Sequence, residues 1–251
     1  MEKNITVTTL GTSHGSPTRE RYNTSTLVEL PDMSFMIDSG APALGQLVRC
    51  GIQESSVKHI FITHMHEDHV GGLPDMVKFM SKGALKDYEF NIWLPEAEAE
   101  EGLRAFCKSM HVRISEKISF HVIEAGTLID TPDFKVEAYL TDHFGYAAKW
   151  YPSFAFGVFA SSKRMLFTGD LSSDFHDFPQ GLDMDFVLCE LTHYKLENAI
   201  PILAKQHFGK LVFNHVGNPW HGEENVERWR NLVKDLPYPA FLAWDMDKFT
   251  V

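Results

Sequence analysis

Cysteine is scarce in this sequence and forms no paired motif. Only Cys50, Cys107 and Cys189 occur among 251 residues, far apart and odd in number. Structural disulfides need paired cysteines and are found mostly in oxidising compartments. The pattern therefore argues against a disulfide framework and predicts reduced thiols in a cytoplasmic protein.

Positive charge is also in short supply. The 23 lysines and arginines are outnumbered by 34 aspartates and glutamates, which gives a formal net charge of −11 at pH 7 with histidine neutral. Proteins that hold long nucleic acids present a basic face, because the phosphate backbone dominates their affinity. We therefore expect no large nucleic-acid partner. A small ester substrate is compatible with this charge.

Long apolar runs are absent as well. No stretch approaches the roughly 20 consecutive apolar residues of a membrane-spanning helix, and residues 1–10 lack the apolar segment of a signal peptide. We therefore expect no membrane partner. With 251 residues, of which 44% are hydrophobic, the chain is long enough for a sizeable core. We predict one domain over residues 1–251 and leave a homodimer open as its assembly.

Histidine, by contrast, is concentrated in one stretch. Residues 63–72, THMHEDHVGG, place His64, His66, Asp68 and His69 within six residues. Imidazole nitrogens and carboxylate oxygens are the usual ligands of Zn²⁺ and similar cations. The apolar residues before this stretch predict a buried strand, and those after it predict a helix, so the ligands are expected on a loop. Four ligands exceed what one catalytic metal usually takes from one loop, which favours two adjacent metals.

Hydrophobic alternation and turn residues predict the other elements. Strands are expected at residues 5–10, 26–30, 34–38, 57–62, 90–94, 118–123, 134–140, 153–160, 165–168, 186–191, 210–214 and 240–243. Helices are expected at residues 43–50, 73–80, 96–110, 196–207 (kinked at Pro201) and 223–234. Four polar residues stand where strands end: Asp38, His143, Asp170 and His215. Strand ends on one rim of a sheet converge, so we expect these side chains near the histidine-rich loop.

The sequence resembles the metallo-β-lactamase superfamily, whose HxHxDH signature stands here as His64, His66, Asp68 and His69. Within it, the chain is most similar to the ribonuclease Z group, the tRNA 3′-end endonucleases and their phosphodiesterase relatives. Three segments carry that likeness: Leu10-Gly11-Thr12, Pro17-Thr18 with Arg21, and Asn23-Thr24-Ser25. The resemblance implies an α/β (α+β) fold, a four-layer αββα sandwich.

The resemblance also implies a cofactor of two divalent metal ions, zinc by preference, with manganese or iron as alternatives. His64, His66 and His143 would hold one ion, Asp68, His69 and His215 the other, and Asp170 would bridge them. Asp38 would orient the ligand loop, because a metal-bound imidazole needs its other N–H fixed. Two adjacent cations lower the pKa of a shared water, so a metal-bridging hydroxide is the expected nucleophile.

His193 matches the histidine of a ribonuclease Z motif, His-Ser-Thr, that is implicated in protonating the leaving group. Such an acid suits phosphodiester cleavage, since an expelled alkoxide leaves poorly without a proton. Glu190 is placed to orient or tune this imidazole. With Asp68, these two residues form the predicted catalytic set. The sequence continues as Tyr194-Lys195 rather than Ser-Thr, so a helix-start histidine without a catalytic role is the alternative.

Other departures lead away from tRNA. Asp170 follows His143 by only 27 positions, too few for the arm with which ribonuclease Z holds tRNA. We therefore expect a metal-dependent hydrolase of a small phosphodiester. A lactone, lactam or thioester hydrolase on the same metals is the alternative, because glyoxalase II-type thioesterases share the loop string. A tRNA 3′-processing endonuclease and a non-catalytic metal-binding module are less favoured.

Overall fold

The computed structural model describes residues 4–52, 56–82, 88–132 and 134–251. The chain falls into two compact units. The first contains the residues up to Ile123 together with Trp244–Thr250, and the second contains Glu124–Ala243. The expectation of a single domain over residues 1–251 stays a prediction.

The first unit is built on a seven-stranded mixed sheet in the order β16-β1-β2-β3-β4-β5-β6. Its strands are β1 (Thr6–Gly11), β2 (Ser25–Glu29), β3 (Ser34–Ile37), β4 (Val57–Phe61), β5 (Phe90–Leu94), β6 (Ile118–Val122) and β16 (Asp247–Thr250). The strands from β16 to β3 pair antiparallel, and those from β3 to β6 pair parallel. Parallel neighbours need crossover connections, and helices supply them here.

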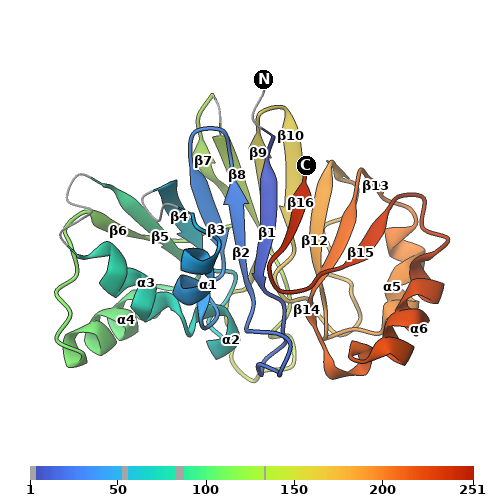
Figure 1. Cartoon of the computed structure of the whole chain (residues 1–251), viewed down its shortest axis with the longest axis horizontal. Helices are drawn as coiled ribbons and strands as arrows, with labels where there is room; N and C mark the ends of the chain where they lie inside the picture. Colours follow the sequence, from blue (N-terminus) through green and yellow to red (C-terminus); the bar gives the residue numbers. More distant parts are fainter. Residues whose placement is uncertain (1–3, 53–55, 83–87, 133) are drawn as a thin grey trace. The chain divides into compact units, whose positions relative to one another are not determined.

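Within the described part of this unit, the helices are α1 (Ala43–Arg49), α2 (Glu67–Val70), α3 (Leu73–Met80) and α4 (Ala97–Ser109). Figure 1 shows α3 and α4 lying alongside the parallel part of the sheet. Apolar residues at helical spacing, such as Leu73, Met76, Val77 and Met80 of α3, are buried in one hydrophobic cluster with residues of β4 and β5. Each such burial contributes roughly 1.5–3 kcal/mol, which fixes the helices against the sheet.

The second unit repeats this strand pattern in the order β15-β14-β12-β10-β9-β8-β7. Its strands are β7 (Gly126–Asp130), β8 (Phe134–Leu140), β9 (Phe154–Ala160), β10 (Lys163–Phe167), β12 (Phe186–Leu191), β14 (Leu211–Val216) and β15 (Ala240–Leu242). The strands from β7 to β10 pair antiparallel, and β10, β12, β14 and β15 pair parallel. A two-stranded sheet, β11 (Asp183–Met184) and β13 (His207–Phe208), joins two of its loops.

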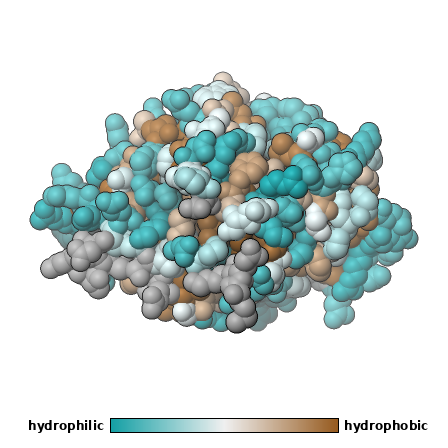
Figure 2. Space-filling model, turned by 90° about the horizontal axis from the view of Figure 1, so that it is seen from above, coloured by the Kyte–Doolittle hydropathy of each residue, from teal (hydrophilic) through white to brown (hydrophobic). Residues whose placement is uncertain are grey.

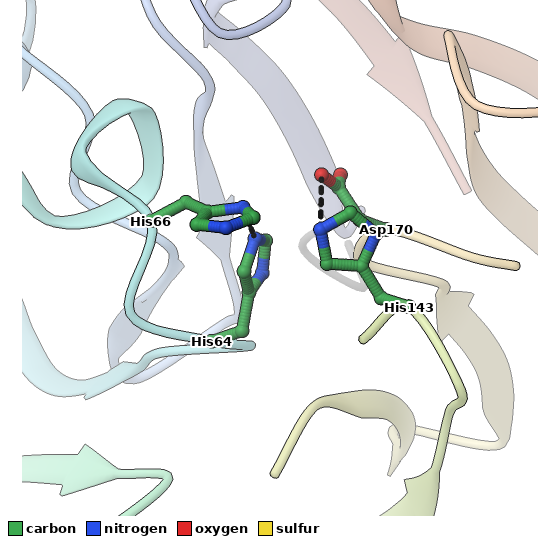
Figure 3. A group of neighbouring side chains, drawn as sticks. All are labelled: His64, His66, His143 and Asp170. Carbon is green, nitrogen blue, oxygen red and sulfur yellow. Dashed lines mark hydrogen bonds and ion pairs between the residues drawn. The ribbon is translucent and has the colours of Figure 1, made fainter. Parts of the chain in front are cut away.

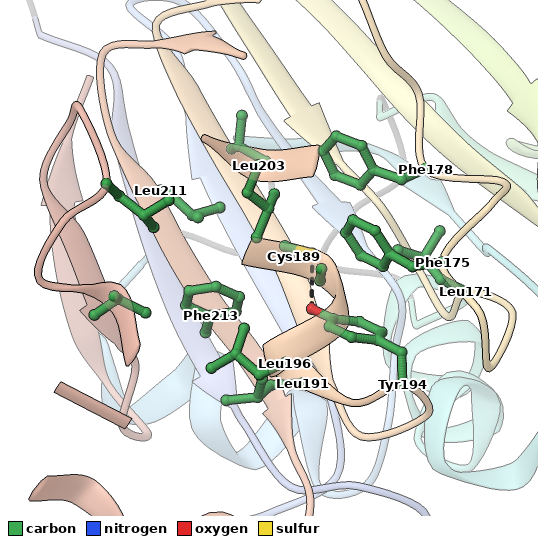
Figure 4. Packing of buried hydrophobic residues seen from close by; sticks show 14 of the residues in the cluster. Leu171, Phe175, Phe178, Cys189, Leu191, Tyr194, Leu196, Leu203, Leu211 and Phe213 are labelled. Atoms are coloured by element: carbon green, nitrogen blue, oxygen red, sulfur yellow. Dashed lines mark hydrogen bonds between the residues drawn. The ribbon is translucent and has the colours of Figure 1, made fainter. Parts of the chain in front are cut away.

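Helices α5 (Leu196–Leu203) and α6 (Glu223–Val233), with the 3₁₀ turn η3 (Asn218–Trp220), complete the second unit. Its core gathers aromatic and aliphatic side chains from β12, β14, α5 and the loop after β10 (Figure 4). Phe175 stacks on Phe178 with ring centroids 4.8 Å apart and packs against Tyr194 at 4.3 Å. This packing anchors the loop that follows β10, which carries part of the candidate site.

The helix expected at residues 196–207 ends early, at Leu203. Gln206 Nε2 donates to the carbonyl of Ile202, and Gln206 Oε1 accepts from the N–H of Gly181. These contacts divert the chain into β13. Strands β7 and β16 were not expected from the sequence, because both are short and half-exposed.

The surface is mixed in character. Figure 2 shows a face on which hydrophilic side chains are interspersed with small hydrophobic areas. Among the residues that the structure describes, no helix is long and apolar enough to cross a membrane.

Candidate metal centre

The histidine-rich stretch leaves the carboxyl end of β4 and turns into α2, which comes before the helix predicted at residues 73–80. His64 and His66 lie on the loop as expected, but the prediction was wrong for Asp68 and His69, which lie on this short helix. His64 is fully buried, and Asp68 and His69 on α2 are almost so. His64 Nε2 lies 3.0 Å from His66 Nδ1, and the two rings point toward each other (Figure 3). His69 Nε2 lies 3.5 Å from Asp68 Oδ2. We call these four residues the loop cluster.

Asp38 holds the loop cluster in place from the end of β3. Asp38 Oδ2 accepts a hydrogen bond from His69 Nδ1 at 2.8 Å, and Oδ1 accepts the N–H of Thr63 at 2.8 Å. The Thr63 hydroxyl donates to the same carboxylate at 3.0 Å. These contacts fix which nitrogen of His69 faces away from Asp38. That Asp38 thereby orients a metal ligand stays a prediction.

The backbone around Asp38 combines an unfavourable conformation with a close approach to α2. Asp38 adopts a left-handed conformation with φ of 59°, which costs a non-glycine residue about 1–3 kcal/mol. At Gly40, an added Cβ would lie 2.1 Å from the carbonyl oxygen of Asp68. Only glycine therefore lets this turn approach α2, and the N–H of Ser39 donates to the carbonyl of His69 at 2.7 Å.

The second unit carries another polar group, at one edge of its sheet. Strands β8, β10, β12 and β14 all run in the same direction, because β8 and β10 both pair antiparallel with β9, and β12 and β14 are parallel to β10. Their carboxyl ends therefore meet at one edge. The residues there, which we call the strand-end cluster, are His143, Asp170, Glu190, His193 and His215.

Asp170 is the centre of the strand-end cluster. Its carboxylate lies 3.8 Å from His143 Nε2, 3.6 Å from His193 Nδ1 and 3.6 Å from His215 Nδ1. Figure 3 shows the pairing of His143 with Asp170. One ligand atom each from Asp170, His193 and His215 lie within 4.8 Å of one another, which is close enough for a shared cation. Asp170 itself is only 2% exposed.

The donor sets of both clusters fit divalent metals. Imidazole and carboxylate donors suit Zn²⁺, Mn²⁺ and Fe²⁺, and no soft thiolate is among them. Two nitrogens bound to one tetrahedral Zn²⁺ at about 2.0 Å from the ion lie about 3.3 Å apart. The 3.0 Å spacing between His64 Nε2 and His66 Nδ1 is close to that value. Which of the predicted ligands would bind which of two ions stays a prediction.

Glu190 and His193 form a hydrogen-bonded pair. His193 Nδ1 lies 3.1 Å from Glu190 Oε1, and Glu190 Oε2 accepts the N–H groups of Thr192 at 2.6 Å and His193 at 3.1 Å. Glu190 Oε1 also accepts the N–H of Leu171 at 3.1 Å. Because its carboxylate is fixed by three main-chain donors, Glu190 holds the His193 ring in one orientation. The ring lies between His143, 4.6 Å away by centroid, and His215, 5.5 Å away.

Two residues at this edge were missed by sequence reasoning. The Thr192 hydroxyl donates to the carbonyl of His215 and lies 3.1 Å from His215 Nδ1. His215 has a positive φ of 48°, so this contact supports an unfavourable backbone conformation. Tyr194 Oη donates to the carbonyl of Glu190 at 2.5 Å and lies 3.4 Å from Cys189 Sγ. Tyr194, which stands where ribonuclease Z has serine, therefore ties the His193 turn to β12.

The segment that carries the ribonuclease Z-like residues of the first unit is fixed by the two residues Trp244 and Asp245, shortly before β16. Asp245 accepts the Thr12 hydroxyl at 2.6 Å and the N–H of Tyr22 at 2.7 Å. Arg21 donates to Thr12 Oγ1 at 2.6 Å and stacks 4.0 Å over the Trp244 ring. Burial lowers the pKa of Arg21 to about 10 and raises that of Asp245. The order of this loop thus depends on Trp244 and Asp245.

Known proteins are similar to this chain in sequence and in fold. A family model described as "Anti-Pycsar protein Apyc1" matches residues 5–196, which is well over half of the sequence. The chain belongs to this family. Curated relatives include ribonuclease Z of a Picosynechococcus species, 33% identical over 146 residues, or 56% of this chain and 45% of that protein. Ribonuclease Z of Methanothermobacter thermautotrophicus is 30% identical over 137 residues, which cover 55% of this chain and 44% of that protein. The matched region is thus less than half the length of these relatives.

Solved structures show the fold. The chain is similar to the metallo-β-lactamase fold protein YhfI from Bacillus subtilis, with a TM-score of 0.78 and 15% identity over 99% of this chain and 100% of that one. A diphosphatase from the PhnP family has a TM-score of 0.75 at 19% identity, and the match covers 100% of this chain and 98% of that one. The short form of human tRNase Z also has a TM-score of 0.75 at 19% identity, and the match covers 97% of this chain and 98% of that one. The predicted α/β fold class and the ribonuclease Z-like resemblance are confirmed.

Proposed function

We propose that this protein is a metal-dependent hydrolase that cleaves a small phosphodiester. The observation that carries the proposal is the Glu190–His193 pair beside Asp170 at the strand-end edge. An imidazole held this way suits proton delivery to a leaving oxygen. A thioester needs no such acid, because a thiolate with a pKa of about 8.5 leaves unaided.

The proposed ligands are those that the sequence signature assigns. His64, His66 and His143 would hold one divalent ion, Asp68, His69 and His215 would hold the other, and Asp170 would supply a carboxylate to both. When bound, the two ions supply a water of lowered pKa and offset the negative charge that grows on the attacked phosphate oxygen. Asp38 fixes His69, and Thr192 fixes His215, so that each imidazole presents one nitrogen.

In this proposal, His193 is the side chain that delivers a proton to the leaving oxygen. Its Nδ1–H donates to Glu190, which stabilises the protonated ring and leaves Nε2 to deliver a proton to the departing alkoxide. Glu190 does not change partner in this step, because its oxygens are already occupied by main-chain N–H groups. We propose catalytic roles for His193, Glu190 and Asp68, with Asp68 acting as a ligand beside His69.

The names of similar proteins support a phosphorus-centred reaction. The curated relatives are named ribonuclease Z, and a solved structural neighbour is a diphosphatase. A long RNA is a poor substrate for a chain with a net charge of −11. We therefore propose a small-molecule diester and not tRNA.

The test is hydrolysis of bis(p-nitrophenyl) phosphate by the full chain with its metal content assayed in parallel. Turnover with about two metals per chain supports the proposal, and cyclic and other small diesters are the next substrates. A metal-loaded protein that hydrolyses a thioester or lactone but no diester would instead support the alternative reaction.

His66→Ala tests the site, and His207→Ala is its matched control. We expect this variant to lose metal and activity while its circular dichroism spectrum is unchanged, because His66 is half-exposed on a loop. His207→Ala removes an exposed histidine outside both clusters, so it should keep both metal and activity. Full activity in His66→Ala would contradict the assignment of the loop cluster.

A further inference from the structure

A cavity of about 320 Å³ lies in the second unit, against the strand-end cluster. Its walls come from the segments that follow β8 and β10, and His193 contributes from the end of β12. The residues that matter for its chemistry are Asp142, His143, Tyr146, Asp174, His176 and His193. Any molecule in this cavity therefore lies against the proposed acid and one proposed ligand.

The two walls of the cavity are tied together. Asp177 Oδ2 accepts the N–H of Asp142 at 2.6 Å, and the same carboxylate accepts the N–H of Ser172 at 3.0 Å. The Asp142 carboxylate folds back over Gly145, where an added Cβ would lie 2.7 Å from Asp142 Oδ2. Asp142 is thus held at the cavity wall by its main chain and by the absence of a side chain at Gly145.

The cavity wall is rich in hydrogen-bond acceptors. Asp174 Oδ1 lies 2.5 Å from His176 Nδ1, and His176 Nε2 lies 3.5 Å from Asp142 Oδ2. The hydrogen bond from His176 lowers the pKa of Asp174 to about 2, and its partner's carboxylate raises the pKa of His176. Asp177, which is not among the lining residues, is a third carboxylate near this imidazole. Together the three carboxylates outnumber His176, so this group of four residues stays negative even when His176 carries a proton.

We propose that this cavity binds the organic part of the ester that leaves as the alcohol, and that Asp142 and Asp174 select a group that donates hydrogen bonds and carries no negative charge. The proposal rests on the proposed function, because the leaving oxygen must lie within hydrogen-bonding reach of His193. Ionised carboxylates only accept hydrogen bonds. Hydroxyl and ammonium groups supply donors, whereas a carboxylate or second phosphate meets like charge. Tyr146, with 75% of its surface exposed, offers a ring for an apolar face of the same group.

The experiment uses the metal-loaded full chain and a set of phenols as probes. The phenols have matched acidity and carry a hydroxymethyl, an aminomethyl or a carboxylate substituent, and their dissociation constants are measured by calorimetry. We expect the first two to bind about tenfold more tightly than the carboxylate at low salt. The preference should shrink at high salt, because Asp142 and Asp174 are more than half exposed. Tight binding of both the hydroxymethyl and aminomethyl probes identifies hydrogen-bond donation as the criterion, and tight binding of the aminomethyl probe alone identifies positive charge.

Variants locate the preference in the cavity. Asp142→Asn and Asp174→Asn should each reduce the tenfold ratio to about threefold or less, because each removes one negative charge. Asp130→Asn, which neutralises an exposed aspartate that does not line the cavity, should keep the ratio. Equal binding of all three probes by the unmodified protein, or tightest binding of the carboxylate, would overturn the proposal.

A parallel assay separates this inference from the proposed function. Methyl 4-nitrophenyl phosphate is hydrolysed if the protein is a phosphodiesterase, whatever the cavity prefers. Selective binding of the phenols without turnover of this diester would contradict the proposed function while the binding preference stands. Turnover without selective binding would contradict the cavity proposal alone.

Discussion

Glu190 Oε1 lies 3.1 Å from Nδ1 of His193, and the Glu190 carboxylate is only 2% exposed. A carboxylate buried this deeply needs partners, since an unpaired buried charge is costly. Here the partners are main-chain N–H groups and one imidazole. The pair therefore has one arrangement, which is what a positioned proton donor requires.

His193→Ala tests the proton donor. We expect the rate with an alkyl diester to fall about 10²–10⁴-fold, the usual contribution of general acid catalysis. The rate with a nitrophenyl diester should fall much less, because nitrophenolate leaves without a proton. The two rates are compared in metal-loaded protein, and equal losses would show that His193 acts in some other way.

Glu190→Gln keeps an acceptor for His193 but removes the charge that stabilises the protonated ring. We expect the alkyl diester to be slowed by about tenfold or more, with a smaller effect on the nitrophenyl diester. Glu197→Gln, a change at an exposed position on α5 that pairs with Arg228, is the control and should leave both rates unchanged. The ratio of the two rates is the measurement, and an unchanged ratio in Glu190→Gln would contradict its role in tuning His193.

Asp38→Asn tests the support of the loop cluster. The variant loses a charged acceptor for His69 Nδ1 and for Thr63. Loss of such a partner typically weakens metal binding by 10- to 100-fold, so we expect a drop of about that size. Titration with a competing chelator measures it. Metal affinity equal to that of the unmodified protein would show that His69 is oriented by other contacts.

Tyr194→Phe tests the anchor of the His193 turn. The change leaves the Glu190 carbonyl without this donor in a buried environment, so we expect a loss of about 1–3 kcal/mol in the free energy of unfolding. Burial raises the pKa of the Tyr194 hydroxyl well above its usual value, so it stays a donor at any pH where the protein is used. Urea denaturation measures the loss. Tyr22→Phe, at a residue 42% exposed, is the control and should unfold at the unmodified midpoint.

His59 makes the first unit sensitive to acid. Burial lowers its pKa from 6.5 to about 4, with smaller contributions from His121 and Lys58. The indole N–H of Trp93 donates to His59 Nδ1 at 3.3 Å, which requires the neutral ring. The unfolded chain binds a proton below pH 6.5 and the folded chain does not, so stability is complete above pH 6.5 and falls as the pH drops toward 4. In metal-free protein, His59→Gln should reduce the difference in urea midpoint between pH 7.5 and pH 5; an unchanged difference would show that other groups cause it.

The main elements could be read from the sequence because their signals are local. A strand, the predicted ligands and a helix follow one another in one continuous stretch around residues 57–80. Strands β5 and β12 have the predicted limits. The contacts of Thr192 with His215 join residues 23 positions apart, and no local sequence pattern predicts them. Asp177 is similar, because its role in joining two loops depends on the register of β8 and β10. Which residues bind metal stays a prediction.

Strand β16 has a consequence for how the first unit folds. It pairs with β1 across nearly the whole length of the chain, and Asp245 just before it fixes Thr12 and Tyr22. During synthesis, all of Glu124–Ala243 is made before this strand, so the first unit completes its edge only after the second unit's sequence exists. Such distant pairing is slow to form. The second unit, continuous from β7 to β15, is the part able to finish first.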